Sequence, residues 1–204
     1  MHKAFCTFYW SNIWNMINKK EKKIGLFIKR IFDIIASLIT LFVLIPIFVI
    51  LGILIKLDSK GPIFFIQKRV GKDGEIFKMY KLRTMVANTE NSGLGYSLSK
   101  NDSRITKIGK HLRWGIDELP QVINVLKGEM SLVGPRPNLF NQYELIHERD
   151  VRGIYDVLPG VTGLAQVKNI DMSTPELLAQ TDKLMIDSLT IKDYFKYVGF
   201  WGFG

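Results

Sequence analysis

One long apolar segment dominates the pattern of hydrophobic and polar positions along this chain. No charged side chain occurs between Ile34 and Ile55, and Pro46 stands near the middle. This length is sufficient for one helix to cross a bilayer. Lysine or arginine stands on both sides, at positions 19, 20, 22, 23, 29 and 30 before it and 56, 60, 68, 69 and 72 after it. Basic flanks favour the cytoplasmic side, so a helix broken at Pro46 that returns to the same face fits as well as a crossing helix.

Shorter patterns after this segment predict a hairpin and a loop. Ile63–Val70 and Glu75–Met85 are rich in β-branched and aromatic residues, and Gly71–Gly74 separates them. This combination predicts two antiparallel strands joined by a tight turn. Asn88–Ser103 is polar and contains two glycines. It therefore predicts a long surface loop, which is either a tolerated insertion or a segment that closes over a site.

Helical spacing recurs in the second half of the chain. Apolar residues at positions 105, 108 and 112 predict a helix over 104–113 with a basic exposed face. Ser173–Glu176 has capping-box spacing and a proline in the first turn, so a helix is predicted from there toward Leu189. Between these helices, Pro159–Gly163 predicts a tight turn that leads into a strand over Leu164–Val167.

The two ends of the chain share aromatic and basic residues. Residues 1–24 combine five aromatic side chains with a cluster of four lysines at positions 19, 20, 22 and 23, and residues 194–204 are rich in phenylalanine, tyrosine and tryptophan. Both compositions are suited to a membrane surface, although core packing is an alternative for the tail. The lysine cluster in the first segment follows its aromatics, which is unlike a secretory signal peptide. We therefore expect residues 1–24 to be retained as a basic and aromatic extension.

Length and charge narrow the function classes. A chain of 204 residues can hold one sizeable domain and a membrane element. Its net charge of +9 favours an anionic partner, which can be nucleic acid, lipid headgroups or a phosphorylated substrate. The single cysteine, Cys6, excludes an internal disulfide and a cysteine-based zinc site. No nucleic-acid motif appears, so we expect no nucleic-acid partner.

Asp117 and Glu118 are the candidate chemical groups. Apolar residues from Leu119 to Leu126 share one helical face, Pro120 fits only a first turn, and Gly128 is placed to end the helix. The two carboxylates would then lie at a helix N-terminus, where the helix dipole stabilises negative charge or a bound phosphate. Simple capping is the alternative.

Arginines and prolines near this pair favour phosphate chemistry over capping. A carboxylate that attacks phosphorus needs a divalent cation and arginines to neutralise the approach of two anions. Candidate neutralising residues are Arg83, Arg104, Arg113 and Arg136. Pro135 and Pro137 fix the backbone on either side of Arg136, which would hold its guanidinium ready for a bidentate phosphate contact.

The chain resembles the bacterial sugar transferases known as monotopic phosphoglycosyl transferases, small enzymes that begin glycoconjugate assembly on polyprenyl phosphate. The resemblance covers approximately residues 29 to 193. Its motifs are Lys29–Asp33, Phe77–Met85 (which contains Lys81), Arg104–Gly109, Asp117–Pro137 and Pro159–Gln166. Several motifs in this order make a chance match very improbable. One departure concerns Arg113, which stands four residues before Asp117 where family members commonly have an arginine five residues before.

This resemblance implies a two-step reaction at the cytoplasmic face of the bacterial inner membrane. Asp117 would attack the sugar-linked phosphorus of a UDP-sugar, release UMP and hold the phosphosugar until polyprenyl phosphate displaces it. Glu118 would help to bind Mg²⁺ together with Asp117. Lys81, with the arginines and prolines named above, would contact phosphate. The resemblance also implies that the apolar segment is a re-entrant helix broken at Pro46.

We therefore predict an α+β, mostly helical protein with four parts. These are the extension (1–24), a re-entrant membrane helix (25–58), a cytoplasmic catalytic domain with a β-hairpin and interfacial amphipathic helices (59–193), and an interfacial aromatic tail (194–204). The expected partners are a UDP-sugar, polyprenyl phosphate and membrane lipid, and a homodimer is left open. The alternative is a non-catalytic membrane scaffold that binds anionic lipids or an assembly partner.

Overall fold

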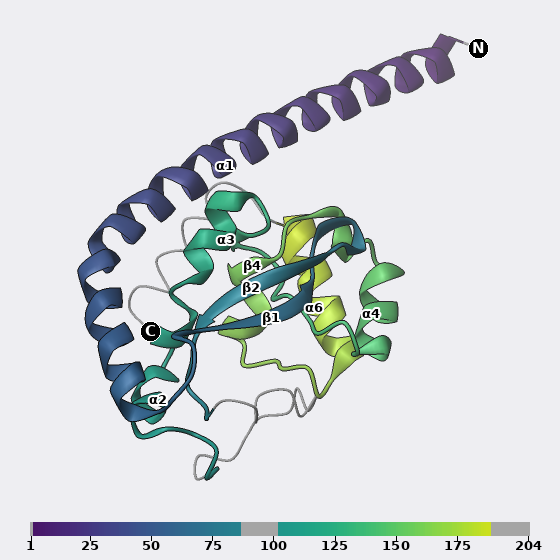
Figure 1. Ribbon diagram of the computed structural model, residues 1–204. Coiled ribbons are helices and arrows are strands. Elements are labelled where there is room, and N and C mark those ends of the chain that lie inside the picture. The colour runs from purple at the N-terminus through teal and green to yellow at the C-terminus, as the bar shows by residue number, and fades with distance from the viewer. Residues whose placement is uncertain (1, 87–101, 189–204) are drawn as a thin grey trace.

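The computed structural model describes residues 2–86 and 102–188, with side chains from residue 24 onward in these ranges. Its helices are α1 (His2–Asp58), α2 (Lys107–Leu112), α3 (Gln121–Lys127), α4 (Tyr143–Asp150), α5 (Leu164–Val167) and α6 (Pro175–Ser188). Its strands are β1 (Phe64–Val70), β2 (Ile76–Leu82), β3 (Ser131–Val133) and β4 (Gly160–Thr162). The predicted class, α+β and mostly helical, is confirmed (Figure 1).

The predicted hairpin is confirmed. Strands β1 and β2 pair antiparallel, with Phe64 opposite Leu82 and Val70 opposite Ile76. A short 3₁₀ turn, η1 (Lys72–Gly74), joins them. One face of β2 packs against α3 and the second sheet, in a buried cluster formed by Phe77, Met79, Val125, Met130 and Val161. The hairpin is therefore held on the rest of the domain by apolar burial.

The second sheet corrects one prediction. Strands β3 and β4 pair in parallel, and residues 164–167, predicted as a strand, form helix α5 instead. The strand of this region is β4, which lies earlier, in the stretch predicted as a turn. It forms there because Gly160 lets its backbone approach the backbone of Gly134 closely. Its N–H donates to the Pro135 carbonyl at 2.8 Å, and a Cβ at Gly160 would stand 2.1 Å from the Gly134 nitrogen. A contact of this kind requires glycine.

The start of α3 also differs from the prediction. Asp117 and Glu118 lie in a separate 3₁₀ turn, η2 (Ile116–Glu118), and α3 begins only at Gln121. Pro120 has no N–H to donate four residues back, so the chain tightens into three-residue bonds before the helix can start. The end of the helix is as expected, since Gly128 adopts a left-handed conformation with φ of 85°.

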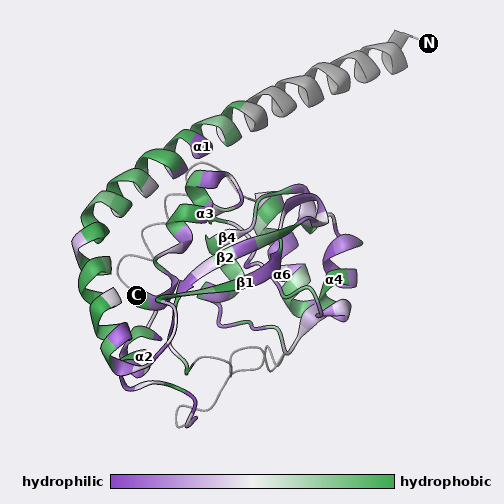
Figure 2. Cartoon of the chain, in the orientation of Figure 1, coloured by the Kyte–Doolittle hydropathy of each residue, from purple (hydrophilic) through white to green (hydrophobic). Residues whose placement is uncertain are grey.

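Helix α1 is continuous and curves along one side of the domain (Figure 1). The helical segment Ile24–Asp58 is, by its length and composition alone, long and apolar enough to cross a membrane. Figure 2 shows this stretch as largely hydrophobic, whereas hydrophobic and hydrophilic residues alternate along the rest of the described chain. The break expected at Pro46 is absent, because the helix runs through this proline. The loss of one backbone hydrogen bond is compatible with a curved helix.

The N-terminal side of the apolar segment is bonded to the domain. Asp33, which is 1% exposed, accepts hydrogen bonds from the Ser131 hydroxyl at 2.8 Å and from the Leu132 N–H at 2.9 Å. Arg30 donates to the Val125 carbonyl at 2.9 Å. Buried polar groups of this kind are costly to leave unpaired, so they fix α1 against β3 and α3.

The C-terminal side of the segment is bonded to the same domain. Asp58 accepts the Ile108 N–H at 2.8 Å. Arg83, which is 1% exposed, donates to the carbonyls of Ile55 and Ser59 at 3.2 and 2.7 Å. The Ile55 carbonyl also accepts the Ser59 N–H, so Arg83 adds a second donor there and supplies a partner for the Ser59 carbonyl just past the helix end. Both ends of the apolar segment are therefore attached to one folded unit.

Of the remaining predicted elements, the two helices lie in the described part of the chain, whereas most of the loop and the tail do not. The helices predicted around positions 104–113 and 173–189 are present as the shorter α2 and α6. Thr106 begins α2 by accepting the Gly109 N–H at 2.9 Å, and Pro175 occupies the first position of α6. The loop residues 88–101 and the aromatic tail lie outside the described residues.

The contact between Gly134 and Gly160 predicts a large difference between two glycine substitutions. We expect Gly160→Ala to lower the free energy of unfolding by at least about 3 kcal/mol, because backbone atoms must move apart. The control, Gly74→Ala, meets no atom within 4 Å and has φ of 75°. It should cost only about 1 kcal/mol, the penalty of a left-handed residue. Urea unfolding in detergent micelles measures both, and equal losses would contradict the assigned β3–β4 contact.

Candidate active site

Glu118 is held by two cations from two other parts of the chain. The amine of Lys81, from β2, donates to its Oε1 at 2.7 Å. Arg136, from the loop after β3, makes a bidentate contact with the same carboxylate, in which Nη1 lies 3.2 Å from Oε2 and Nη2 bonds Oε1. The structure thus brings together three of the predicted site residues. Paired charges with such geometry are stronger than ordinary hydrogen bonds.

These contacts keep Glu118 ionised. Burial by itself would raise the pKa of its carboxyl, but the charges and hydrogen bonds of Lys81 and Arg136 outweigh burial and lower the pKa to about 2. The Glu118 carboxylate therefore remains a fixed negative charge at neutral pH.

Asp117, the neighbouring residue, is in a different state. Burial, with a smaller contribution from Glu118, raises the pKa of its carboxyl, while Lys81 and Arg113 act in the opposite direction. No ion pair to Asp117 is found among residues 24–86 and 102–188. A carboxylate that is partly desolvated and not engaged by a cation is a better nucleophile than one held in a salt bridge. The two adjacent carboxylates therefore suit different tasks.

The backbone of the Pro135–Pro137 loop is fixed by buried donors. Besides the bond from Gly160 to Pro135, the Arg69 guanidinium donates to the Pro137 carbonyl at 3.1 Å. Arg149 donates to the carbonyl of Arg136 itself at 2.8 Å. Each carbonyl of this loop is thereby occupied, so the loop holds one conformation and presents the Arg136 side chain to Glu118.

Arg149 is in turn held by a buried ion pair between α4 and α6. Its Nη2 lies 2.6 Å from Asp182, and the two side chains are 2% and 1% exposed. Its Nη1 also donates to the Asn138 side chain at 2.9 Å. The sequence reasoning missed both Arg149 and Arg69. No signal in the sequence indicated them, because the burial of an arginine among its partners depends on the fold.

A buried amide fixes the position of Lys81. Asn124, in α3, is fully buried and accepts the Tyr80 N–H at 3.1 Å. The same side chain donates to the Lys78 carbonyl at 2.7 Å. These bonds fix the end of β2 against α3, which begins three residues after Glu118. They set how far Lys81 stands from Glu118.

Two predicted phosphate contacts are placed elsewhere. Arg83 is buried against the end of α1, as described above, where it donates to backbone carbonyls, and its contact with phosphate stays a prediction. Arg104 contacts Asp102 in a bidentate pair, with nitrogen to oxygen distances of 2.9 and 2.6 Å. Arg113 follows α2 and is exposed, and its charge acts on Asp117. Of the predicted arginines, Arg113 and Arg136 interact with the carboxylate pair in the described part of the chain.

Positive charge exceeds negative charge around the pair. Lys81 and Arg113 act on Asp117, and Arg136 contacts Glu118. Arg69 is close enough to interact electrostatically with both Arg136 and Glu118, and burial together with Arg136 lowers its pKa to about 10, so it remains charged at neutral pH. An excess of fixed cations over carboxylates favours a ligand that carries several negative charges, such as a diphosphate.

The carboxylates fit a metal ion only in combination with a ligand. No group of three or more histidine, cysteine, aspartate or glutamate side chains that could hold a metal is found in the described part of the chain. Magnesium is commonly bound by one or two carboxylates together with substrate phosphates and water. Asp117 is the more available ligand, because Lys81 and Arg136 already contact both oxygens of Glu118.

Comparison with known proteins identifies a family. The family model described as "Bacterial sugar transferase" matches residues 24–198. This region begins before the apolar segment of α1 and includes every element that surrounds the carboxylate pair.

Relatives of this chain include three proteins from different bacteria. A UDP-glucose:undecaprenyl-phosphate glucose-1-phosphate transferase of Klebsiella pneumoniae is 40% identical over 84% of this chain and 37% of its own length. A UDP-N-acetylgalactosamine-undecaprenyl-phosphate N-acetylgalactosaminephosphotransferase of Aeromonas hydrophila is 43% identical over 69% of this chain and 34% of its own length. An exopolysaccharide production protein, PSS, of Rhizobium leguminosarum bv. phaseoli is 44% identical over 71% of this chain and 76% of its own length. The chain thus spans only about a third of the length of the first two relatives.

The contacts of Glu118 predict how stability depends on pH. A folded-state pKa near 2, against an ordinary value of 4.5, stabilises the fold above pH 4.5, and this contribution is lost as the pH falls toward 2. Its size is on the order of 3 kcal/mol. We expect Glu118→Gln to lose stability at pH 7 and to show a smaller further loss at pH 3 than the unmodified chain. Urea unfolding at both pH values tests this, with exposed Glu144→Gln as the control. Parallel pH dependence of the Glu118→Gln variant and the unmodified chain would contradict the ion pairs.

Proposed function

Because this chain belongs to the bacterial sugar transferase family, we propose that it transfers a sugar phosphate from a UDP-sugar to polyprenyl phosphate and releases UMP. The observation that carries this proposal is the unequal carboxylate pair. Glu118 is clamped by Lys81 and Arg136, whereas Asp117 is left without an ion pair among the described residues. The named relatives act on different sugars, so the proposal concerns UDP-sugars as a class.

In the first half-reaction, an oxygen of Asp117 attacks the phosphorus attached to the sugar. A bond forms between the carboxylate and phosphorus, and the bond from this phosphorus to the oxygen of UMP breaks. The products are UMP and a phosphosugar bound to Asp117 as an acyl phosphate. The raised pKa of Asp117 is consistent with a basic carboxylate. Arg113, Arg136 and Lys81 supply the positive charge that lets one anion approach another.

In the second half-reaction, a phosphate oxygen of polyprenyl phosphate attacks the same phosphorus. The bond to Asp117 breaks, its carboxylate is regenerated, and polyprenyl diphosphosugar is formed. Glu118 cannot compete as a nucleophile, because two cations hold its oxygens and lower its pKa. The product is the lipid-linked first sugar from which a longer glycan is built, so we propose that the chain serves glycoconjugate or polysaccharide biosynthesis.

We also propose that Mg²⁺ takes part. Asp117, with the remaining lone pairs of the Glu118 carboxylate, would hold the ion together with the phosphates of the UDP-sugar, and the ion would neutralise charge on the departing UMP. The residues of this chain provide the remaining neutralisation and the orientation of the reacting phosphorus.

The attachments of α1 support a re-entrant arrangement. A straight helix from Asp33 to Asp58 is about 38 Å long, which exceeds the bilayer core of about 30 Å. A crossing helix would therefore place these residues on opposite sides of the membrane. Both are bonded to the same domain, Asp33 to Ser131 and Asp58 to Ile108. We propose that α1 enters and leaves the membrane at its cytoplasmic face, where UDP-sugars are available.

Substitution of the nucleophile gives the direct test of activity. We expect Asp117→Asn to reduce UMP release by at least about a thousandfold, because an amide cannot form the acyl phosphate. The unmodified chain, incubated with a radiolabelled UDP-sugar and Mg²⁺, should retain label on the peptide that contains Asp117. The control is Asp187→Asn, which alters an exposed carboxylate paired with Lys183 on α6 and should leave activity unchanged.

Unaltered turnover by Asp117→Asn would disprove the role of this residue. Failure of the unmodified chain to release UMP from a panel of UDP-sugars, together with binding to anionic vesicles, would favour the non-catalytic scaffold.

Cysteine labelling tests the membrane arrangement. With Cys6 replaced by serine, single cysteines at Asn12 and at Asp73 should react with a membrane-impermeant maleimide from the same side of sealed vesicles. Asp73 lies in the exposed turn of the hairpin, with its side chain 69% exposed. Labelling from opposite sides would show a crossing helix and would exclude the re-entrant arrangement. A cysteine at exposed Glu144, on α4, is the control for the side that the domain occupies.

A further inference from the structure

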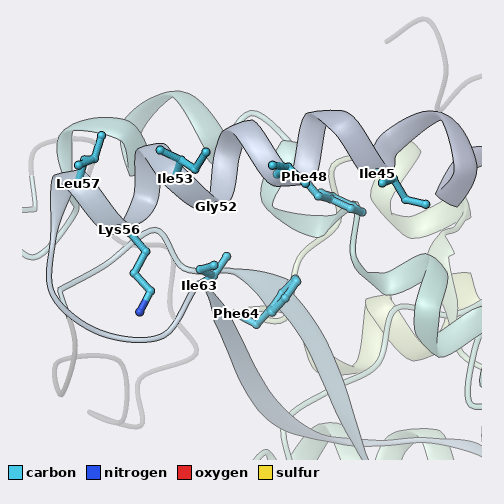
Figure 3. Close-up of a pocket in the computed structure, with 9 residues that line it drawn as sticks. Ile45, Phe48, Gly52, Ile53, Lys56, Leu57, Ile63 and Phe64 are labelled. Atoms are coloured by element: carbon cyan, nitrogen blue, oxygen red, sulfur yellow. The ribbon is translucent and has the colours of Figure 1, made fainter.

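An open apolar groove lies between the C-terminal half of α1 and the start of β1 (Figure 3). Its volume is about 640 Å³. One wall is a stripe of α1 in which every third or fourth residue from Ile45 to Leu57 faces the groove, and the other is formed by Ile63 and Phe64. This stripe extends over about 18 Å of helix. Lys56 is the one charged residue of the lining.

The groove is long and open along α1, so it could hold an extended apolar chain. Gly52 lies midway along the stripe and has no side chain to obstruct it, and a Cβ there would stand 3.2 Å from Ile63. Apolar side chains along the stripe, such as Val49 and Ile53, are 59% and 55% exposed. They belong to the segment that is apolar enough to lie in a membrane. At that depth the available partner is hydrocarbon, because lipid replaces water as solvent.

One wall of the groove leads to the carboxylate pair. Phe64 is opposite Leu82 in the hairpin, and the next residue pair along it is Phe65 and Lys81. Lys81 bonds Glu118, next to Asp117. The strand pair therefore connects the groove with the site at which the proposed second half-reaction occurs. A ligand that lies in the groove and reacts at Asp117 needs a long apolar part and an anionic end.

We propose that this groove binds the isoprenoid chain of the polyprenyl phosphate acceptor, with Lys56 attracting the phosphate end. The proposal rests on the function proposed above and adds a residue-level site for the acceptor. Lys56 forms no ion pair with a carboxylate of residues 24–86 and 102–188, so its charge is available to a phosphate. A lysine at the interface end of an apolar stripe can keep its amine among headgroups while its stem covers the chain.

Two substitutions on neighbouring stripes of α1 provide a matched test. Val49 and Ile50 are both 59% exposed, but only Val49 lines the groove. We expect Val49→Trp to raise the KM for a long-chain polyprenyl phosphate about tenfold, equivalent to 1.4 kcal/mol of binding. Ile50→Trp should leave it unchanged. Neither variant should alter the UMP released before acceptor is added, because that step does not use the groove.

Acceptor length and charge give further readouts. With a one-isoprene phosphate acceptor, Val49→Trp and the unmodified chain should have the same KM, since such an acceptor does not extend along the groove. Lys56→Gln should raise the KM for both acceptors, and the difference should shrink at high salt. An equal effect of Val49→Trp and Ile50→Trp on the KM for long acceptors would overturn the proposal.

Photo-crosslinking tests the groove independently of turnover. A polyprenyl phosphate with a photoreactive isoprenoid chain should label the peptide that contains residues 45–64, and unlabelled polyprenyl phosphate should compete. Equal competition by phosphatidylglycerol would assign the groove to bulk lipid and overturn the proposal. A change of oligomeric state in Val49→Trp would assign it to a second copy, with the same consequence. If crosslinking succeeds while no UDP-sugar releases UMP, the proposed reaction fails and the lipid site stands.

Discussion

The arrangement of the candidate site depends on the carboxylate of Glu118. This one group joins three segments that are far apart in the sequence, because Lys81 approaches it from the hairpin and Arg136 approaches it from the loop after β3. Removing either cation would leave a partly buried negative charge with incomplete compensation, which is costly in a protein interior. The interaction also separates the two acidic neighbours, since the cations that engage Glu118 leave Asp117 uncommitted.

Four arginines of this domain form two groups with different environments. Arg113 and Arg136 present their charge to the carboxylate pair, whereas Arg83 and Arg149 are buried and donate mainly to backbone carbonyls and to Asp182. Arg149 from the second group supports Arg136 from the first. Its guanidinium donates to the Arg136 carbonyl and so restricts the backbone of the loop. A loop with a restricted backbone holds its own arginine side chain at a fixed distance from a substrate.

Features determined by nearby residues were predictable from the sequence, and features determined by distant pairing were not. The hairpin, the C-terminal glycine of α3 and the proline start of α6 follow from local turn and capping chemistry. Strand β4 exists because Gly160 meets Gly134 across a long stretch of chain, which no local pattern indicates. Likewise, a motif can place Arg83 near the site in sequence, but its burial against Ile55 and Ser59 depends on where α1 ends. The carboxylate pair was found because arginines and prolines stand near it in the sequence, which favours phosphate chemistry over capping.

The two attachments of α1 hold both ends of the apolar segment at fixed positions on the folded domain. Asp33 and Asp58 can keep their partners only while β3 and α2 are folded into one unit. An unfolded domain would release both ends, and the apolar segment would then be free to straighten through the bilayer, where its length suffices. In the re-entrant arrangement proposed above, the order of events during synthesis would therefore matter, because the domain must fold before the helix crosses. A substitution far from the membrane that slows folding of the domain would then leave a fraction of the helices crossing the bilayer.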